Sequence, residues 1–294
     1  MLTAQVSGHA FTFKAKAYWE LFKARLSFLV AFSCAFGYIL GSRGIDVYSL
    51  TMLFLGGFLL SGASIALNQV IERDLDKVMS RTMNRPLPTH RLSVSEAIAF
   101  AVICFAASVL ILLTFTNVLT TGLAILSMAL YSFVYTPLKR VGPIAVFVGA
   151  IPGALPPLLG WTAATGTLSV EAWIIFGIQF IWQFPHFWAI AWLADDDYKK
   201  AGFKLLPMGG KKDMNTAIQI MIYTLFLIPF GLLPAKFGIT GINSAIVATI
   251  CGVLFFSQTF SLLKDGNQKS ARRIMFGSFL YLPIVQISFL LDKV

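Results

Sequence analysis

Long uncharged stretches dominate the chain. Asp, Glu, Lys and Arg are missing from residues 26–42, 47–71, 97–138, 141–170, 172–194, 214–235, 237–263 and 274–291. A helix that crosses the hydrocarbon core of a bilayer needs about 20 predominantly apolar residues. Every stretch except 97–138 therefore predicts one membrane-spanning helix, and residues 18–22 extend the first of them.

The stretch 97–138 is too long for a single span. Its middle carries a turn composition, with Thr114, Thr116, Asn117, Thr120, Thr121 and Gly122. We therefore divide it into two helices, which gives nine transmembrane helices. The predicted fold is an all-α polytopic membrane protein, with a polar N-terminal tail over 1–17 and one nine-helix domain over 18–294.

Composition supports this fold and excludes other classes. Hydrophobic residues make up 57% of the chain and charged residues only 12%, about half the usual share for a soluble protein. The mean hydropathy is +0.78. These values exclude a soluble globular enzyme, a disordered chain and a fibrous repeat. The net charge of +10 could suggest nucleic acid, but membrane-protein loops are the simpler place for basic residues, and we expect no nucleic-acid partner.

Basic residues lie mostly on one side of the predicted membrane. The N-terminal segment and the loops after the second, fourth, sixth and eighth helices hold nearly all of them, and only Arg43, Lys236 and Lys293 fall on the other side. Because cytoplasmic loops are enriched in Lys and Arg, we expect a cytoplasmic N-terminus and a C-terminus outside. No cleavable signal peptide is evident at the start of the sequence, and a bacterial inner membrane is the expected location.

Acidic residues are scarce and gather in two places, at 72–76 and at 195–197. Asn68, Glu72 and Asp76 are spaced i, i+4, i+8, so they cover only about 80° of a helix surface, whereas Asp74 points away from that face. Oxygen ligands at this spacing suit Mg²⁺. The alternative is a solvated helix end, with the carboxylates facing the neighbouring Arg73 and Lys77.

Arginines follow this acidic stripe closely. Arg81 and Arg85 stand in the segment RTMNRPLP, directly after Asp76. Carboxylates can hold a metal ion while arginines grip phosphate oxygens with two parallel hydrogen bonds. The pattern therefore favours a binding site for a metal–diphosphate complex at the cytoplasmic end of the second helix.

The segment 68–88, NQVIERDLDKVMSRTMNRPLP, resembles the first signature of the UbiA-type intramembrane prenyltransferases. Three further segments resemble the branch of that family that farnesylates haem. They are YTPLKR at 135–140, GAIPGALPPLLGW at 149–161 and QFPHFWAIAWLADDDYKKAGFKLLPM at 183–208. The resemblance covers about residues 18–291, which is nearly the whole chain.

The resemblance implies nine helices around a central cavity and an Mg²⁺-dependent transfer. The farnesyl group of farnesyl diphosphate would pass to the vinyl group of haem B, with the lipid bilayer surrounding the protein. Asn68, Glu72 and Asp76 would hold the first metal ion, and Asp196 and Asp197 are candidates for a second. The catalytic set would be completed by Lys139. The candidates for diphosphate contacts are Arg25, Arg81, Arg85, Lys139, Lys199 and Lys200.

Two departures from the family pattern affect these assignments. Many relatives have an aspartate four residues before the glycine of the second acidic motif, where this chain has Tyr198 before Gly202. This departure bears on which of the aspartates at 195–197 binds metal. The usual Lys-Pro-Arg at the start of the first helix is Lys23-Ala24-Arg25 here, which changes the entry turn of that helix.

His186 lies in an apolar helix among Trp182, Phe184, Phe187 and Trp188. One interpretation is a buried histidine bonded to a backbone carbonyl. The other is a haem contact, because neutral imidazole is a common axial ligand of haem iron and ionisable residues inside membranes tend to be functional.

Two other functions stay open at this point. One is a related prenyltransferase that acts on a quinone precursor. The other is a transporter of an anionic or metal-bound solute, although transporters usually place ionisable residues at the bilayer midplane on broken helices. Association with a haem A synthase or with an oxidase assembly has no recognisable sequence signal.

Overall fold

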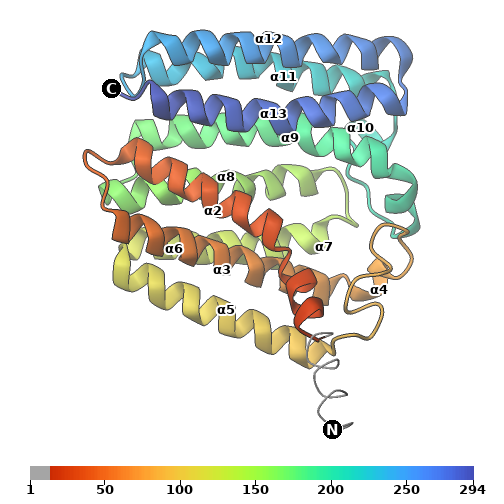
Figure 1. Cartoon of the computed structure of the whole chain (residues 1–294). Coiled ribbons are helices and arrows are strands. Elements are labelled where there is room, and N and C mark those ends of the chain that lie inside the picture. The colour runs from red at the N-terminus through yellow and green to blue at the C-terminus, as the bar shows by residue number, and fades with distance from the viewer. Residues whose placement is uncertain (1–13) are drawn as a thin grey trace, which may run out of the picture.

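Nine long apolar helices lie side by side in the computed structural model, which describes residues 14–294 (Figure 1). The predicted number of spans is therefore confirmed for this part of the chain. Most of the predicted tail, residues 1–13, lies outside the described residues, and residues 14–17 already belong to a helical segment over 14–22. The spans are Ala24–Gly41 (α2), Val47–Ile71 (α3), Val94–Phe115 (α5), Val118–Leu138 (α6, a π-helical turn η1 and α7), Ile144–Thr165 (α8), Val170–Lys200 (α9), Met214–Lys236 (α11), Ile242–Asp265 (α12) and Gln268–Leu291 (α13).

Polar side chains set the ends of several helices, because the first backbone N–H groups of a helix need acceptors. The predicted turn in the stretch 97–138 falls between α5 and α6. There, the Asn117 side chain accepts a hydrogen bond from the Thr120 N–H at 2.9 Å and donates one to the Thr162 carbonyl at 2.8 Å. At the start of α5, Ser93 and Glu96 form a reciprocal capping box.

Neighbouring helices pack against one another through the bundle, from α5 and α3 through α2, α8 and α9 to the group α11, α12 and α13 (Figure 1). Helices α2 and α8 approach until their backbones touch. A Cβ atom at Gly37 would lie 1.9 Å from the Pro157 carbonyl oxygen, and one at Gly160 would lie 1.9 Å from the Cys34 carbonyl oxygen. Small residues allow such close helix packing within a membrane.

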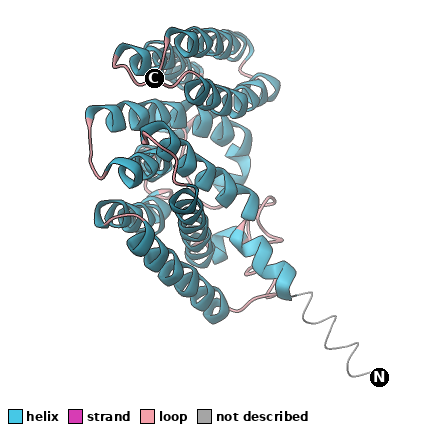
Figure 2. Cartoon of the chain, turned by 60° about the vertical axis from the view of Figure 1, so that its left-hand side comes forward, coloured by secondary structure: helices cyan, strands magenta, loops and turns pink. Residues whose placement is uncertain are grey.

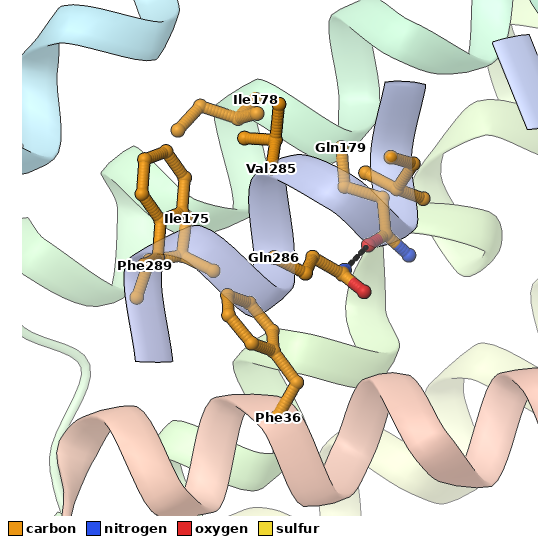
Figure 3. Close-up of a pocket in the computed structure, with 8 residues that line it drawn as sticks. Phe36, Ile175, Ile178, Gln179, Val285, Gln286 and Phe289 are labelled. Atoms are coloured by element: carbon orange, nitrogen blue, oxygen red, sulfur yellow. Dashed lines mark hydrogen bonds between the residues drawn. The ribbon is translucent and has the colours of Figure 1, made fainter. Parts of the chain in front are cut away.

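A buried polar cluster joins the same helices midway along the bundle. Gln179 on α9 accepts hydrogen bonds from Ser33 on α2 and from Gln286 on α13, both at 3.0 Å, and donates one to the Gly153 carbonyl on α8 at 2.8 Å. Figure 3 shows the Gln179–Gln286 bond beside a small apolar pocket that Phe36 and Phe289 help to line. The cluster ties together four helices from distant parts of the sequence.

The loops that carry most of the predicted site residues lie together at one end of the bundle, away from the C-terminus (Figure 1). Short helix α4 (Arg73–Asp76), the end of α7 (Thr136–Leu138) and the end of α9 meet there. Figure 2 shows that helices form the regular structure of the drawn chain and that loops connect them at the two ends. The fold thus brings the two acidic segments of the sequence to one end.

Candidate active site

The predicted acidic stripe forms at the junction of α3 and α4. Helix α3 ends at Ile71, but the Glu72 N–H still donates to the Asn68 carbonyl at 2.9 Å and the Asp76 N–H donates to the Glu72 carbonyl at 2.8 Å. These bonds keep the four-residue spacing through the break. Asn68 and Glu72 are buried and Asp76 is completely so.

The alternative interpretation of these residues as a solvated helix end is wrong. Arg73 and Lys77 both pair with Asp74, at 3.5 and 2.9 Å, and the Asp74 side chain is 67% exposed. Because Asp74 points away from the stripe, the nearest basic residues in sequence do not neutralise Glu72 or Asp76. Their partners come from other segments.

Lys139 is the partner of Glu72. Its Nζ lies 2.8 Å from Glu72 Oε1, and both side chains are buried. The same ammonium group lies 4.7 Å from the ring centre of Tyr135 and 5.7 Å from that of Phe203, at distances typical of cation–π contacts. Burial alone would lower the pKa of Lys139, but the Glu72 carboxylate and the Tyr131 hydroxyl outweigh burial and raise it. Lys139 therefore carries a positive charge next to the stripe.

A π-helical turn over Leu130–Tyr135 positions this part of the site. Such turns are rare and are frequent at functional sites. The turn leads to Thr136, whose hydroxyl accepts a hydrogen bond from Asn68 Nδ2 at 3.0 Å and donates one to the Tyr131 carbonyl at 2.8 Å. Because the amide nitrogen of Asn68 is bound to Thr136, the amide oxygen is the atom of Asn68 that can coordinate a cation.

Arg85 is the partner of Asp76. Its Nη1 lies 2.8 Å from Oδ1 and 2.7 Å from Oδ2 of the buried carboxylate. The Thr82 hydroxyl also donates to the Asp76 carbonyl at 3.0 Å, so the loop after α4 folds back over the stripe. Two carboxylates and two cations are thus paired in one buried patch.

Asp197 on α9 fixes the position of the same loop. Its oxygens accept hydrogen bonds from the backbone N–H groups of Ser80 and Arg81 at 3.1 and 3.0 Å and from Lys200 Nζ at 3.0 Å. The Arg81 guanidinium lies 5.9 Å from the ring centre of Tyr198. Asp197, Lys200 and Arg81 therefore form one rim of the site.

The remaining members of the second acidic segment lie apart from the stripe. Asp195 is buried and pairs with Lys199 at 2.8 Å, whereas the side chain of Asp196 is 82% exposed. Among residues 14–294, no three or more His, Cys, Asp or Glu side chains form a group that could hold a metal ion. The second metal site at Asp196 and Asp197 stays a prediction, and Asp197 has a structural role at the rim.

Lys23 faces the site, and sequence reasoning did not select it. The chain breaks between the helical segment 14–22 and α2, where Lys23 has a left-handed backbone with φ of 48°. Buried side chains satisfy the carbonyls that this break frees: Gln69 donates to the Leu21 carbonyl at 2.7 Å, and Ser27 donates to the Phe22 carbonyl at 3.1 Å. Both contacts hold the break in place.

The environment of Lys23 is strongly cationic. Burial, together with the nearby Arg85 and Arg81, lowers its pKa to about 7. Arg25, one of the six candidate diphosphate contacts, is exposed and takes part in no ion pair among residues 14–294. The left-handed break turns Lys23 toward the site, whereas Arg25, in the first turn of α2, points to the exposed side. The family resemblance selected Arg25, and no residue pattern in the sequence marks the left-handed break at Lys23.

His186 lies in α9 against α13. Its Nδ1 is 2.9 Å from the hydroxyl of Ser278, and its ring stacks on Trp182 with centres 4.4 Å apart. The partner of the ring is therefore a side-chain hydroxyl and not the backbone carbonyl of the first interpretation, and the haem contact stays a prediction. Nearer the loops, the same two helices and the loop after α4 line a cavity of about 380 Å³. Its lining residues are Arg81, Ile190, Leu193, Ala194, Asp196, Asp197 and Met275.

Comparison with known proteins identifies relatives of this chain. The family model described as the UbiA prenyltransferase family matches residues 30–282. A protoheme IX farnesyltransferase of Cytophaga hutchinsonii is 51% identical over 280 residues, which cover 95% of this chain and 98% of that protein. Another of Christiangramia forsetii is 46% identical over 93% of this chain and 92% of that protein.

Solved structures share the arrangement of the helices. A digeranylgeranylglyceryl phosphate synthase has a TM-score of 0.79 at 21% identity, with 95% of this chain and 98% of that chain covered. A UbiA homolog from Archaeoglobus fulgidus bound to GPP and Mg²⁺ has a TM-score of 0.63 at 15% identity, with 93% and 99% covered. At these identities, the likeness extends to the fold alone.

Proposed function

Because the chain belongs to the UbiA prenyltransferase family, we propose that it transfers the farnesyl group of farnesyl diphosphate to a vinyl group of haem B and so forms haem O. The observation that carries the proposal is the buried patch in which Glu72 pairs with Lys139 and Asp76 pairs with Arg85. The acceptor is inferred from the names of the relatives, which are protoheme IX farnesyltransferases at 51% and 46% identity.

The patch fits a complex of Mg²⁺ and diphosphate. Asn68, Glu72 and Asp76 supply oxygen atoms of the kind that Mg²⁺ prefers, and Asn68 has its amide oxygen available. A divalent cation held by these carboxylates would replace Lys139 and Arg85 as their partners, which would leave both side chains able to contact phosphate oxygens. Bound Mg²⁺ would stabilise the negative charge that develops on the diphosphate. The Archaeoglobus homolog bound to GPP and Mg²⁺ supports this assignment by fold.

Cationic side chains surround the proposed position of the diphosphate. Arg85 and Lys139 lie at the stripe, whereas Arg81 and Lys200 lie at the rim that Asp197 organises. We include Lys23 in place of the exposed Arg25, and Lys199 is engaged with Asp195. As the allylic C–O bond breaks, the electron pair leaves with the diphosphate, and these cations stabilise it.

The acceptor step follows from the chemistry of a vinyl group. The terminal vinyl carbon attacks the farnesyl cation and forms the new C–C bond, which leaves a cation at the carbon next to the porphyrin ring. Water adds to that carbon and loses a proton, so the product carries a hydroxyl group. The rings of Tyr135 and Phe203 beside Lys139 provide electron-rich faces that can stabilise a carbocation. Exclusion of water from the farnesyl cation prevents its hydrolysis.

The chain is a multi-pass membrane protein of this family. We place it in a bacterial inner membrane, with the end that holds the stripe and the rim facing the cytoplasm. The excess of Lys and Arg in the loops at that end supports this orientation. Farnesyl diphosphate would then reach the site with its charged head in the cytoplasmic interface and its chain in the bilayer.

The decisive experiment is turnover by the purified protein in lipid nanodiscs with farnesyl diphosphate, haem B and Mg²⁺. We expect haem O by mass spectrometry, no product with EDTA, and turnover without oxygen. In ¹⁸O-labelled water the label should enter the hydroxyethyl group, whereas label from O₂ would exclude the carbocation route. Farnesylation of a quinone precursor but not of haem would overturn the proposed acceptor. Uptake of diphosphate into proteoliposomes without any product would favour a transporter.

A further inference from the structure

Four residues in α9 and α13, among them His186, are linked by hydrogen bonds. The Ser278 hydroxyl lies 2.9 Å from His186 Nδ1, and it donates its own hydrogen to the Met275 carbonyl at 2.6 Å. The carbonyl of Ser278 in turn accepts a hydrogen bond from the Trp182 indole at 2.9 Å. Ser278 is completely buried, so water does not compete for these bonds.

The donor directions of these hydrogen bonds determine which nitrogen of His186 carries the proton. A serine hydroxyl has one hydrogen. Because that hydrogen goes to the Met275 carbonyl, the hydroxyl oxygen can only accept from His186 Nδ1. The neutral ring therefore has its proton on Nδ1 and a free lone pair on Nε2. Histidines that bind metals through one nitrogen almost always donate the other N–H in this way.

Aromatic side chains hold the plane of the ring. Trp182 stacks on His186 with ring centres 4.4 Å apart and an angle of 18°, and Phe279 packs edge-on with centres 5.1 Å apart. The ring cannot turn over without losing the stacking and the Ser278 bond. This rigidity costs conformational entropy, which is lost on folding and not on ligand binding.

His186 also lies on the face of α9 that lines the cavity at the rim. Ile190, Leu193 and Asp197 line that cavity and follow His186 at i+4, i+7 and i+11, a spacing that keeps them on one helix face. On α13, Met275 lines the cavity and lies one turn from Ser278. His186 therefore lies on the cavity-facing side of α9, about one turn before the lining residue Ile190.

We propose that Ser278 is a positioning residue that holds His186 in the Nδ1–H form, so that Nε2 is the axial ligand of the iron of the acceptor haem bound between α9 and α13. The proposal rests on the proposed function, because haem B is the substrate there. It adds the group that selects the ligating nitrogen, the helices that form the acceptor site and the point at which the porphyrin is anchored.

The tautomer can be tested without haem or turnover. The ¹⁵N chemical shifts of labelled histidine, with His186 assigned by comparison with His186→Gln, should show a protonated Nδ1 and an unprotonated Nε2 in the wild type. Ser278→Ala should produce a mixture of the two forms, and Ser278→Thr should retain the wild-type form. A protonated Nε2 in the wild type would overturn the proposal whatever the enzyme makes.

Titration with ferric haem B in nanodiscs tests the ligand itself. The wild type should give the absorption and EPR spectra of an imidazole-ligated haem, and His186→Ala should lose them and regain them with added imidazole. Ser278→Ala should weaken haem binding about 10–100-fold, as is usual when such a supporting contact is lost. Ser288→Ala is the matched control, because Ser288 on α13 donates to the Val285 carbonyl at 2.8 Å without contacting His186.

The outcomes separate this inference from the proposed function. Normal haem O yield with unchanged haem spectra in His186→Ala and Ser278→Ala would refute the inference and leave the enzyme activity standing. A wild type that binds haem through His186 but farnesylates another acceptor would refute the proposed function and leave the ligand assignment standing.

Discussion

Asp76 and Arg85 are joined through both carboxylate oxygens: Arg85 Nη1 lies 2.8 Å from Oδ1 and 2.7 Å from Oδ2. Asp76 is completely buried, and the two residues are nine positions apart on either side of a turn. In the free protein, the carboxylate that we propose as a metal ligand is thus neutralised by the guanidinium that we propose as a diphosphate contact. This pairing explains how like-charged carboxylates can be buried before a substrate arrives.

The first prediction concerns this pair. Arg85→Met should destabilise the protein by about 3–5 kcal/mol, because it leaves a buried carboxylate without a partner. Asp76→Asn/Arg85→Met should recover most of that stability but no turnover. Denaturant unfolding and haem O yield would measure the two effects. Arg91→Met is the control: Arg91 pairs with Glu20 at 2.6 Å nearer the surface, and its loss should cost about 1 kcal/mol or less. Activity in the double variant would contradict the assigned roles.

The second prediction compares two carboxylates of one segment. Glu72→Gln should reduce turnover by about 10²–10³-fold, the usual cost of losing one electrostatic contact to a transition state, and should abolish Mg²⁺-dependent binding of farnesyl diphosphate. Asp74→Asn should change stability by no more than about 0.5 kcal/mol and leave binding intact, because Asp74 is exposed and faces away. Calorimetric titration of farnesyl diphosphate with and without Mg²⁺ distinguishes them. Equal Mg²⁺-dependent binding in the two variants would show that the metal ion does not bind at the face that carries Glu72.

The third prediction is a dependence of diphosphate binding on pH. Because the pKa of Lys23 is lowered to about 7, its ammonium group is charged below that pH and neutral above it. The affinity of the free protein for diphosphate should therefore lose the contribution of Lys23 as the pH rises through about 7. Lys23→Arg should keep that contribution to higher pH, since guanidinium stays charged. Titrations of inorganic diphosphate from pH 6 to pH 9 measure this.

Matched variants separate Lys23 from its neighbour. Lys23→Met should bind diphosphate more weakly at pH 6 and lack the step near pH 7, whereas Arg25→Gln, on the exposed side of the same turn, should behave as the wild type. The stability of the folded protein should depend on pH in the opposite direction to the affinity for diphosphate. Folding lowers the pKa of Lys23 from 10.5, so the unfolded chain binds more protons between about pH 7 and 10.5, and stability attributable to this group rises with pH there. If Lys23→Met bound diphosphate with wild-type affinity at pH 6, Lys23 would not be a diphosphate contact.

The fourth prediction concerns Asp197. Asp197→Asn should raise the KM for farnesyl diphosphate more than it lowers kcat, because it loosens the backbone of Ser80 and Arg81 that the carboxylate now holds. Hydrogen exchange at residues 80 and 81 should become faster. Asp196→Asn, at an exposed position, should have little effect. A large loss of kcat together with a higher Mg²⁺ requirement in Asp197→Asn would instead identify it as a metal ligand.

Local sequence patterns were sufficient to predict the membrane-spanning helices and the shared face of Asn68, Glu72 and Asp76. Uncharged length predicts a membrane span because an ionised group is costly in hydrocarbon, and this cost does not depend on the neighbouring helices. The break at Thr116 and Asn117 was also local, since the Asn117 side chain caps the helix that follows it. Asn68, Glu72 and Asp76 share a face because helical geometry repeats every 3.6 residues.

Only the tertiary structure decided which charges meet. Sequence proximity suggested Arg73 and Lys77 as neighbours of the stripe, but packing of α7 and of the loop after α4 supplies Lys139 and Arg85. The choice between Lys23 and Arg25 depends on one left-handed residue that Gln69 and Ser27 hold in place. His186 meets its hydrogen-bond partner Ser278, 92 residues away, only because α9 packs against α13. Such pairings depend on how helices pack, which the spacing of residues along one helix does not encode.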